Sequence, residues 1–260
     1  MAAEFAGRWA LVTGASAGIG AALARELARQ GAKLILTARR ADRLEALAAE
    51  LRGQGTEVRI VTADLNERGG PQAIRDATAG MDVDVLVNNA GLGQYGAFVS
   101  SGLEQELSQV RVNCEAVVHL TRLFAPAMAE RRRGWILVVA STASFQPVPY
   151  LSTYAATKAF DRFFAEALAA ELAASGVRVT ALCPGPTESE FFEVAGAAKF
   201  RARGVQSVEQ VARRAVDALR RGRRVIVPNA SGRLSAMAVR FLPTRWITAL
   251  VERAARPGKK

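Results

Sequence analysis

Short apolar runs alternate along the chain with longer stretches in which apolar residues recur every three or four positions. The runs are rich in Val, Ile and Leu, which is typical of strands buried on both faces of a sheet. The longer stretches, such as residues 21–30 and 41–52, predict amphipathic helices. The expected strands are Ala10–Thr13, Lys33–Thr37, Val58–Thr62, Asp84–Asn88, Trp135–Ala140, Val177–Leu182 and Arg224–Pro228.

Strands that alternate with helices predict parallel pairing, because a parallel connection must cross the sheet and a helix is the usual crossover. The pattern therefore predicts a doubly wound α/β fold of about seven strands in a single domain over residues 1–230. Residues 231–260 then place apolar residues at helical spacing, interrupted by Pro243, among many arginines. We expect this basic amphipathic extension to pack on the domain, on a neighbouring subunit or on a membrane surface.

The amino-acid composition excludes several classes of protein and of functional site. Of 260 residues, 50% are hydrophobic and 23% are charged, so a large core is expected and global disorder is not. One histidine and two cysteines are too few for a His-rich zinc site or a disulfide scaffold, and no metal is expected. The low cysteine count, without a signal-peptide pattern or a membrane-spanning apolar run, predicts a cytoplasmic protein.

The net charge of +11 is concentrated in the last quarter of the chain. Residues 1–200 contain 20 Lys and Arg against 21 Asp and Glu, whereas residues 201–260 contain 15 against 3. This asymmetry predicts one local basic surface and argues against a nucleic-acid-binding protein. For the extension we favour docking on a subunit or on its own sheet, with peripheral membrane binding as the alternative and no nucleic acid as partner.

A glycine-rich turn joins the first expected strand to the first helix. Gly14, Gly18 and Gly20 are spaced G-x-x-x-G-x-G, which differs from the general dinucleotide fingerprint. Glycines let a ligand approach the backbone, and the free N–H groups of the following helix favour an anion. The turn, with Ser16 inside it, therefore predicts a nucleotide site, although three glycines here could also form a turn without a ligand.

The end of the second expected strand indicates which dinucleotide would bind. An acidic residue that binds a ribose 2′-hydroxyl is missing, and Thr37-Ala38-Arg39-Arg40 stands there instead. A small residue followed by arginines leaves room for a 2′-phosphate and offers planar charged partners. NADP is therefore favoured over NAD, with Arg39 and Arg40 as contacts. The alternative is that both arginines only solvate the start of a helix.

Two further strand ends carry polar residues. The third expected strand ends in Ala63-Asp64-Leu65, and the fourth ends in Asn88-Asn89-Ala90-Gly91. Open α/β sheets bind ligands at the carboxyl ends of their strands, so both segments are candidate cofactor contacts. Asp64 could accept a hydrogen bond from an adenine amino group, whereas the second segment could equally be a turn.

A tyrosine and a lysine one helical turn apart follow the fifth expected strand. Ser141 ends that strand, Tyr154 opens the next helical stretch, and Lys158 shares its helix face. A nearby ammonium lowers the pKa of a phenol, so Tyr154 could exchange a proton with a carbonyl or alcohol oxygen. Ser141 could orient the same oxygen, and Asn113 could hold a water that connects Lys158 to solvent. Taken alone, Tyr-x-x-x-Lys is common by chance.

The ordered set of motifs resembles the short-chain dehydrogenase/reductase family over about residues 7–228. The resemblance implies a Rossmann-type fold, a nicotinamide cofactor, a homodimer or homotetramer, and a catalytic tetrad of Asn113, Ser141, Tyr154 and Lys158. Lys158 would also bind the nicotinamide ribose. Further cofactor contacts implied by the resemblance are Ile19, Asp64, Asn88, Gly91, Pro184, Gly185 and Thr187.

The segment after the sixth expected strand departs from the family pattern. It is Pro184-Gly185-Pro186-Thr187-Glu188-Ser189, which leaves open whether Thr187 or Ser189 would meet the nicotinamide carboxamide. With the residues that follow, this run looks like a bacterial subgroup of uncharacterised oxidoreductases called DltE-like.

These observations predict an oxidoreductase that transfers a hydride between NADP(H) and a carbonyl or secondary alcohol, with Tyr154 as general acid and base. The alternative is a non-catalytic nucleotide-binding or membrane-peripheral scaffold, which would not need a proton donor. An apolar or aromatic substrate is expected, because residues 145–151 contain no Arg or Lys and residues 186–205 could form an apolar lid. The expected substrate-binding residues, each of which could instead belong to the core, are Gln94, Tyr95, Phe145, Val148, Tyr150, Leu151, Phe191 and Phe192.

Overall fold

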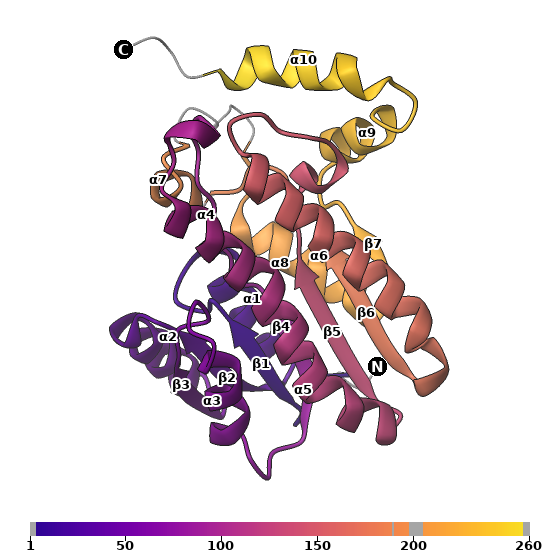
Figure 1. The fold of residues 1–260 in the computed structure, drawn as a ribbon. Helices are drawn as coiled ribbons and strands as arrows, with labels where there is room; N and C mark the ends of the chain where they lie inside the picture. Colours follow the sequence, from indigo (N-terminus) through magenta and orange to yellow (C-terminus); the bar gives the residue numbers. More distant parts are fainter. Residues whose placement is uncertain (1–3, 189, 198–204, 257–260) are drawn as a thin grey trace.

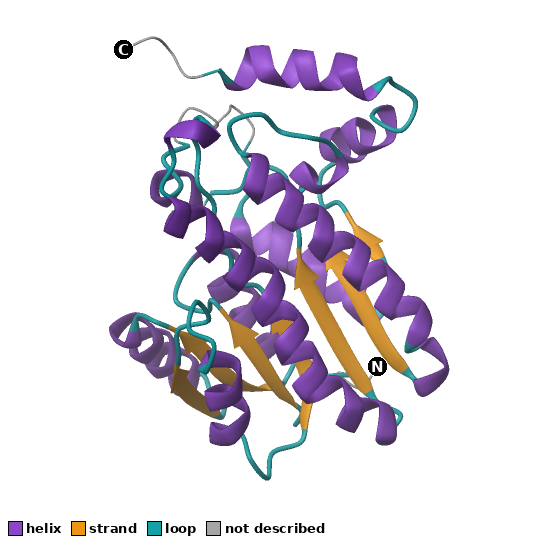
Figure 2. Cartoon of the chain, viewed as in Figure 1, coloured by secondary structure: helices purple, strands orange, loops and turns teal. Residues whose placement is uncertain are grey.

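Parallel strands form one sheet in the computed structural model, which describes residues 4–188, 190–197 and 205–256. The strands are β1 (Trp9–Thr13), β2 (Lys33–Ala38), β3 (Val58–Thr62), β4 (Val83–Asn88), β5 (Gly134–Val139), β6 (Val177–Leu182) and β7 (Val225–Ile226). Their order in the sheet is β3-β2-β1-β4-β5-β6-β7. Figure 2 shows the strands in orange between the helices. The chain therefore winds outward in two directions from β1 and β4, and the doubly wound α/β prediction is confirmed.

Helices cover both faces of this sheet (Figure 1). One face carries α1 (Gly18–Arg29), α2 (Ala41–Gly53) and α8 (Val208–Arg220). The other carries α3 (Gly70–Ala77), α5 (Ala116–Glu130) and α6 (Ser152–Glu171). Two shorter helices, α4 (Leu103–Val110) and α7 (Phe191–Val194), belong to the connections that follow β4 and β6.

The alternation of side chains along each strand divides the core into two halves. In β1, Val12 packs on the side of α1, whereas Leu11 packs on the side of α5 and α6. Every residue of β4 and β5 is buried, as expected for central strands covered on both faces. Burial of one such aliphatic side chain contributes about 1.5–3 kcal/mol, so the sheet holds the loops at its carboxyl end in fixed positions.

A few element boundaries differ from the prediction. The strand expected over residues 224–228 is reduced to Val225–Ile226, because β7 is an edge strand and Pro228 has no N–H to donate. No helix was predicted from the sequence where α3 lies, with Pro71 in its first turn. Between α4 and α5, the chain forms one π-helical turn, η2 (Arg111–Glu115). Such turns are frequent at functional sites.

Two helices, α9 (Ala230–Ala238) and α10 (Thr244–Ala255), make up the C-terminal extension. Pro243 directly precedes α10, where the sequence predicts a break. Figure 1 shows α10 lying across the end of the molecule at which the strands terminate. Among the described helices, none is both long enough and apolar enough to cross a bilayer.

Candidate active site

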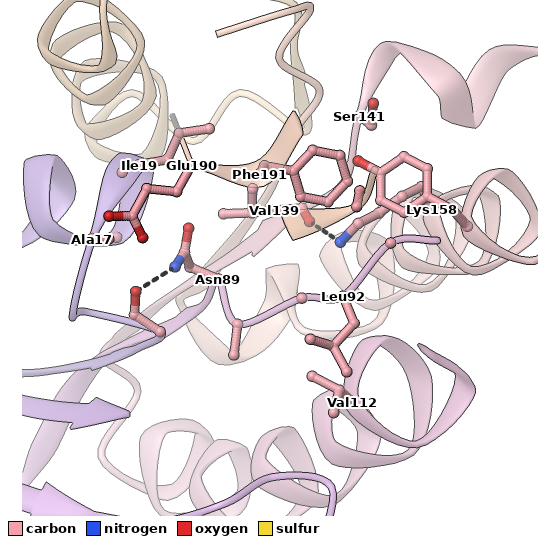
Figure 3. A pocket seen from close by; sticks show the side chains of 18 of the residues that line it. Ala17, Ile19, Asn89, Leu92, Val112, Val139, Ser141, Lys158, Glu190 and Phe191 are labelled. Atoms are coloured by element: carbon pink, nitrogen blue, oxygen red, sulfur yellow. Dashed lines mark hydrogen bonds between the residues drawn. The ribbon is translucent and has the colours of Figure 1, made fainter. Parts of the chain in front are cut away.

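A cavity of about 470 Å³ opens at the carboxyl ends of the strands, where the strand order reverses between β1 and β4. Its walls come from the segments that follow β1 to β6 and from the region of α7. In Figure 3, Ala17 and Glu190 lie toward one end of the cavity, and Ser141 and Lys158 lie toward the other. The cavity can therefore hold an elongated ligand.

The glycine turn after β1 brings bare backbone to the cavity. Gly14 and Gly18 have φ angles of +64° and +55°, which glycine adopts at low cost. A Cβ at Gly20 would lie 2.3 Å from the carbonyl oxygen of Gly14, so α1 approaches the turn this closely only with glycine there. Ala17, which precedes α1, supplies no side-chain cap. The first N–H groups of α1 are therefore available to an anion.

Thr13 and Asn89 join this turn to the end of β4. Thr13 Oγ accepts hydrogen bonds from the N–H groups of Asn89 (2.9 Å) and Ala90 (3.0 Å). Asn89 Nδ2 donates to the carbonyl oxygen of Thr13 at 2.8 Å. The segment after β4 is therefore both a tie between two loops and part of the cavity wall.

Charged residues surround the end of β2. Arg39 and Arg40 both line the cavity, and Arg39 lies 3.9 Å from the carboxylate of Asp64. Arg40 pairs with Glu190 across the cavity at 2.9 Å. Glu190 also pairs with Arg43, and hydrogen bonds from Arg43 and Arg40 lower its pKa. Exposed ion pairs of this kind contribute little stability, so a ligand anion could take the place of Glu190.

Two hydroxyl groups meet on the opposite part of the wall. Tyr154, near the start of α6, packs its ring against Phe191 of α7, with 5.1 Å between the ring centroids. The side chain of Ser141 acts on its phenol and lowers the pKa of the tyrosine, which places the two hydroxyls close together. Ser141 Oγ also accepts a hydrogen bond from the N–H of Ala143 at 3.1 Å. The ring contact of Tyr154 and the hydrogen bond of Ser141 therefore hold the two hydroxyls in place. Both residues line the cavity.

Lys158 lies in a buried ion pair that is not predicted from the sequence. Its Nζ donates to the carboxylate of Asp161 at 2.9 Å. It also donates to the carbonyl oxygen of Val139 at 2.7 Å, the bond drawn in Figure 3. Lys158 is 4% exposed and Asp161 is 1% exposed. Burial disfavours the charge on Lys158, but Asp161 and Tyr154 outweigh it and raise the pKa of the lysine. Burial raises the pKa of Asp161 to about 6 against the effect of Lys158, so both groups are charged at neutral pH.

The pKa of Tyr154 moves in the direction opposite to the prediction. Burial raises it above its usual value, Lys158 and Ser141 lower it by less, and Asp161 adds to the increase. The prediction of a phenol made acidic by its lysine is therefore wrong for this structure, because burial of the phenol outweighs the effect of the ammonium, which the carboxylate of Asp161 also opposes. At neutral pH Tyr154 is a protonated acid, which is the form that donates a proton.

Replacing Asp161 with Asn is expected to lower the pKa of Tyr154, because the ammonium of Lys158 would then act on the phenol without an opposing carboxylate. Alcohol oxidation requires the phenolate, so its rate should rise at lower pH in the variant than in the wild type. The pH dependence of kcat in the oxidative direction measures this shift. The ionisable groups around the pair are Tyr154 and Arg162 on α6, Cys114 on η2 and Cys183 after β6.

Glu166→Gln is the matched control for Asp161→Asn. Glu166 lies on the same helix and pairs with Arg162 at 3.0 Å, away from Lys158. Its loss should leave the pH profile in place. If both variants had the wild-type profile, Asp161 would have no electrostatic effect on Tyr154.

Asn113 lies on the π-helical turn η2 and is fully buried. Its Oδ1 accepts from the N–H of Leu92 at 2.8 Å, and its Nδ2 donates to the Leu92 carbonyl at 2.9 Å and to Thr157 Oγ at 2.8 Å. The predicted role of holding a water stays a prediction, and it would fall to groups of this segment other than the side-chain atoms that make these bonds. The side chain of Asn113 fixes the backbone next to Gly91, which lies between Asn113 and Lys158.

Most of the predicted site residues are brought together by the fold. Those that line the cavity are Gly14, Ser16, Gly18, Ile19, Gly20, Arg39, Arg40, Asp64, Leu65, Ala90, Gly91, Ser141, Val148, Leu151, Tyr154, Lys158, Pro184, Gly185, Thr187 and Phe191. Which of them contact a cofactor or a substrate remains a prediction.

Several predicted residues do not line the cavity, and their partners explain why. Besides Asn113, they are Asn88, Gln94, Tyr95, Phe145 and Tyr150. Asn88 donates to Thr121 Oγ at 3.0 Å, on the side of α5. Phe145 packs under the guanidinium of Arg162, 4.6 Å from its ring centroid. The side chain of Phe192 and residue Ser189 lie outside the described residues.

The two predicted tyrosines contact the C-terminal helix instead. Tyr95 donates from its hydroxyl to the carbonyl oxygen of Ala255 at 2.8 Å. Tyr150 donates to Glu252 at 2.9 Å, and that bond raises the pKa of the phenol. These aromatic side chains therefore anchor α10 to the loops that carry Leu92 and Val148 of the cavity wall.

A family profile and individual curated proteins both match this chain. The short chain dehydrogenase family profile matches residues 8–199. A very-long-chain 3-oxoacyl-CoA reductase of Anas platyrhynchos is 38% identical over 185 residues, which is 68% of this chain and 59% of that protein. One of Podospora anserina is 39% identical over 181 residues, which is 66% of this chain and 53% of that protein. The chain thus spans little more than half the length of these relatives.

Solved structures are similar over most of the chain. A short-chain dehydrogenase from Sphingobium yanoikuyae in complex with NADPH has a TM-score of 0.83 and 34% identity, and the match covers 89% of this chain and 92% of that one. The bulky-bulky ketone specific alcohol dehydrogenase from Comamonas testosteroni has a TM-score of 0.79 and 29% identity, with 90% and 92% covered.

Proposed function

The chain belongs to the short-chain dehydrogenase/reductase family, and on that basis we propose that it is an NADPH-dependent reductase of apolar carbonyl compounds. As a member of the family it is an oxidoreductase with a nicotinamide dinucleotide cofactor. The position of Tyr154 carries the proposal: a protonated phenol near Ser141 lines a cavity that can hold an elongated ligand.

The residues at the glycine turn fit a dinucleotide. Gly14, Gly18 and Gly20 leave the backbone accessible, and the uncapped start of α1 offers N–H groups to a pyrophosphate. Thr187 lines the cavity beside Pro184 and Gly185, where the resemblance implies a contact with the carboxamide.

The end of β2 supports NADPH over NADH. No carboxylate follows Ala38 to accept from a ribose 2′-hydroxyl, and Arg39 and Arg40 face the cavity there. A 2′-phosphate near Arg40 would compete with Glu190 for the same guanidinium group. Arg40 thus already binds an anionic group of the protein, the carboxylate of Glu190, at the position that we propose for the 2′-phosphate.

The chemistry of the site follows from the protonation of its residues. The cofactor would supply a hydride to the carbonyl carbon. Tyr154 would donate its proton to the carbonyl oxygen, and Ser141 would hydrogen-bond the same oxygen and orient it. Asp161 and Val139 hold Lys158 in place. Its ammonium charge would stabilise the phenolate that Tyr154 becomes when it has donated its proton.

The far part of the cavity favours an apolar substrate. Its wall there consists of Leu92, Gly93, Val148, Leu151 and Phe191. The named relatives are very-long-chain 3-oxoacyl-CoA reductases, and a solved neighbour acts on bulky ketones. We therefore place 3-oxoacyl thioesters with long chains first among candidate substrates, followed by bulky aryl ketones.

Oxidation of NADPH with a series of 3-oxoacyl-CoA thioesters of increasing chain length tests this function. Each buried methylene contributes up to about 0.8 kcal/mol, so kcat/KM should rise by as much as about fourfold per methylene until the apolar wall is filled. Aryl ketones should be reduced more slowly. If NADPH were oxidised no faster with any thioester or ketone than without substrate, the function would be refuted.

The oligomeric state stays a prediction, and the structure shows where to test it. Exposed apolar side chains lie on α4, α5 and α6, among them Leu103 (75% exposed) and Phe163 (62% exposed). A homodimer or homotetramer that used this face would cover them. Light scattering of the wild type and of Leu103→Gln would detect the change in mass.

A further inference from the structure

Helices α9 and α10, with the turn between them, present large apolar side chains to solvent. Leu234 and Met237 lie three residues apart on α9, Phe241 lies in the turn that follows, and Trp246 and Leu250 lie four residues apart on α10. Phe241 is 83% exposed and Leu250 is 72% exposed. The side chains of this C-terminal patch are Leu234, Met237, Phe241, Leu242, Trp246 and Leu250.

Arginines surround the C-terminal patch without opposing charges. Arg233, Arg240, Arg245 and Arg253 are exposed, and no carboxylate in the described part of the chain pairs with any of them. The guanidinium of Arg245 lies 6.0 Å from the ring centroid of Trp246. Large apolar groups and uncompensated positive charge therefore occupy the same surface.

Contacts with the domain hold this surface outward. The buried residues of α10 are Ile247 and Ala255, on a different side of the helix from Trp246 and Leu250. The hydroxyl of Tyr95 binds the carbonyl oxygen of Ala255. Tyr150 binds Glu252, which also pairs with Arg256. The helix therefore docks on loops of its own chain through Tyr95 and Tyr150, and the exposed side chains of Trp246 and Leu250 stay uncovered. Figure 1 shows α10 at the end of the molecule.

We propose that the C-terminal patch docks on an anionic lipid bilayer. Apolar side chains would enter the headgroup region, while arginines would contact anionic headgroups, each contributing about 1 kcal/mol near such a surface. A second copy of this patch would bring four like charges against four more, which is unfavourable. A nucleic acid would leave Phe241, Trp246 and Leu250 without apolar partners.

Docking in this orientation would place the substrate end of the cavity beside the bilayer. The loops that anchor α10 through Tyr95 and Tyr150 also carry Leu92, Gly93 and Val148 of the cavity wall. This consequence rests on the proposed function: a long-chain substrate dissolved in lipid would reach the site without crossing water. Membrane binding itself does not depend on catalysis, so it can be tested separately.

Flotation of the full-length protein with vesicles tests the proposal. The vesicles are pure phosphatidylcholine, or phosphatidylcholine mixed with phosphatidylglycerol in equal amounts. The protein should float with the mixed vesicles at an ionic strength of about 0.01 M and much less at about 1 M, where the Debye length falls from roughly 30 Å to roughly 3 Å. It should bind pure phosphatidylcholine weakly.

Two double variants separate the patch from general positive charge. Arg240→Gln with Arg253→Gln should lower the partition coefficient on mixed vesicles by about 30-fold, since each arginine contributes about 1 kcal/mol. The matched control, Arg223→Gln with Arg224→Gln, removes two exposed arginines just before β7 and should float like the wild type. Trp246→Gln with Leu250→Gln should reduce flotation without changing the oligomeric state.

Three outcomes would overturn the proposal. The wild type would not float with mixed vesicles at low salt, or both arginine pairs would have equal effects on flotation. Alternatively, Trp246→Gln with Leu250→Gln would convert an oligomer into a smaller species by light scattering while vesicle binding was absent, which would make the patch a contact between copies.

Discussion

Replacing Tyr154 with Phe is expected to lower kcat for carbonyl reduction by about two to four orders of magnitude, the range typical of positioned general acids. Phe keeps the ring that packs 5.1 Å from the centroid of Phe191 and removes the hydroxyl near Ser141. The cavity wall would therefore be preserved while the proton donor is lost. Initial rates at saturating NADPH measure the effect.

Tyr150→Phe is the matched control, because it also removes one phenol near the site. Tyr150 donates to Glu252 and does not line the cavity, so its loss should change kcat by only a few-fold. NADPH fluorescence should report similar cofactor affinity in both variants. Wild-type turnover in Tyr154→Phe would reject the acid role of Tyr154.

The fold could be predicted from the sequence because its strands are continuous apolar runs. β4 and β5 are buried along their whole length, so their sequences contain no competing signal. Only the ends of the edge strand β7 could not be predicted well. There Arg224 and Pro228 lie on either side of a strand of two residues, Val225–Ile226. The apolar pattern gave the strand its place but not its ends.

The backbone part of the site could also be predicted, whereas side-chain directions could not. Glycine positions such as Gly14 follow from the conformation of the turn itself, so local sequence determines them. Asn88 and Tyr150 lie in the expected segments, but their side chains point to α5 and α10. A residue's partner in another element depends on tertiary packing, which no local pattern contains.

The electrostatics of the site depend in part on Asp161, whose spacing from Lys158 is visible in the sequence. Asp161 lies three positions after Lys158 on a helix, the spacing at which opposite charges pair. The spacing could have indicated the contact, which we did not predict, but not its burial. Burial of the phenol is the main reason why Tyr154 stays protonated, and the buried carboxylate of Asp161 adds to it by opposing Lys158.

Replacing Arg39 with Asp is expected to lower kcat/KM for NADPH by about 10²-fold and to change kcat/KM for NADH little. A hydrogen bond to a charged group contributes about 1.5–3 kcal/mol, and the new carboxylate would repel a 2′-phosphate as well. Arg39 is 60% exposed at its side chain, so the effect should shrink as ionic strength increases. Initial rates with each cofactor at two salt concentrations measure both parts of this result.

Arg122→Asp separates a local contact from a change in net charge. Arg122 is exposed on α5 and does not line the cavity, so the same charge reversal there should leave the preference for NADPH intact. A wild-type enzyme that used NADH as efficiently as NADPH would contradict the assignment of Arg39 and Arg40. In that case the two arginines would serve their partners Asp64 and Glu190, and the missing carboxylate after β2 would not report cofactor choice.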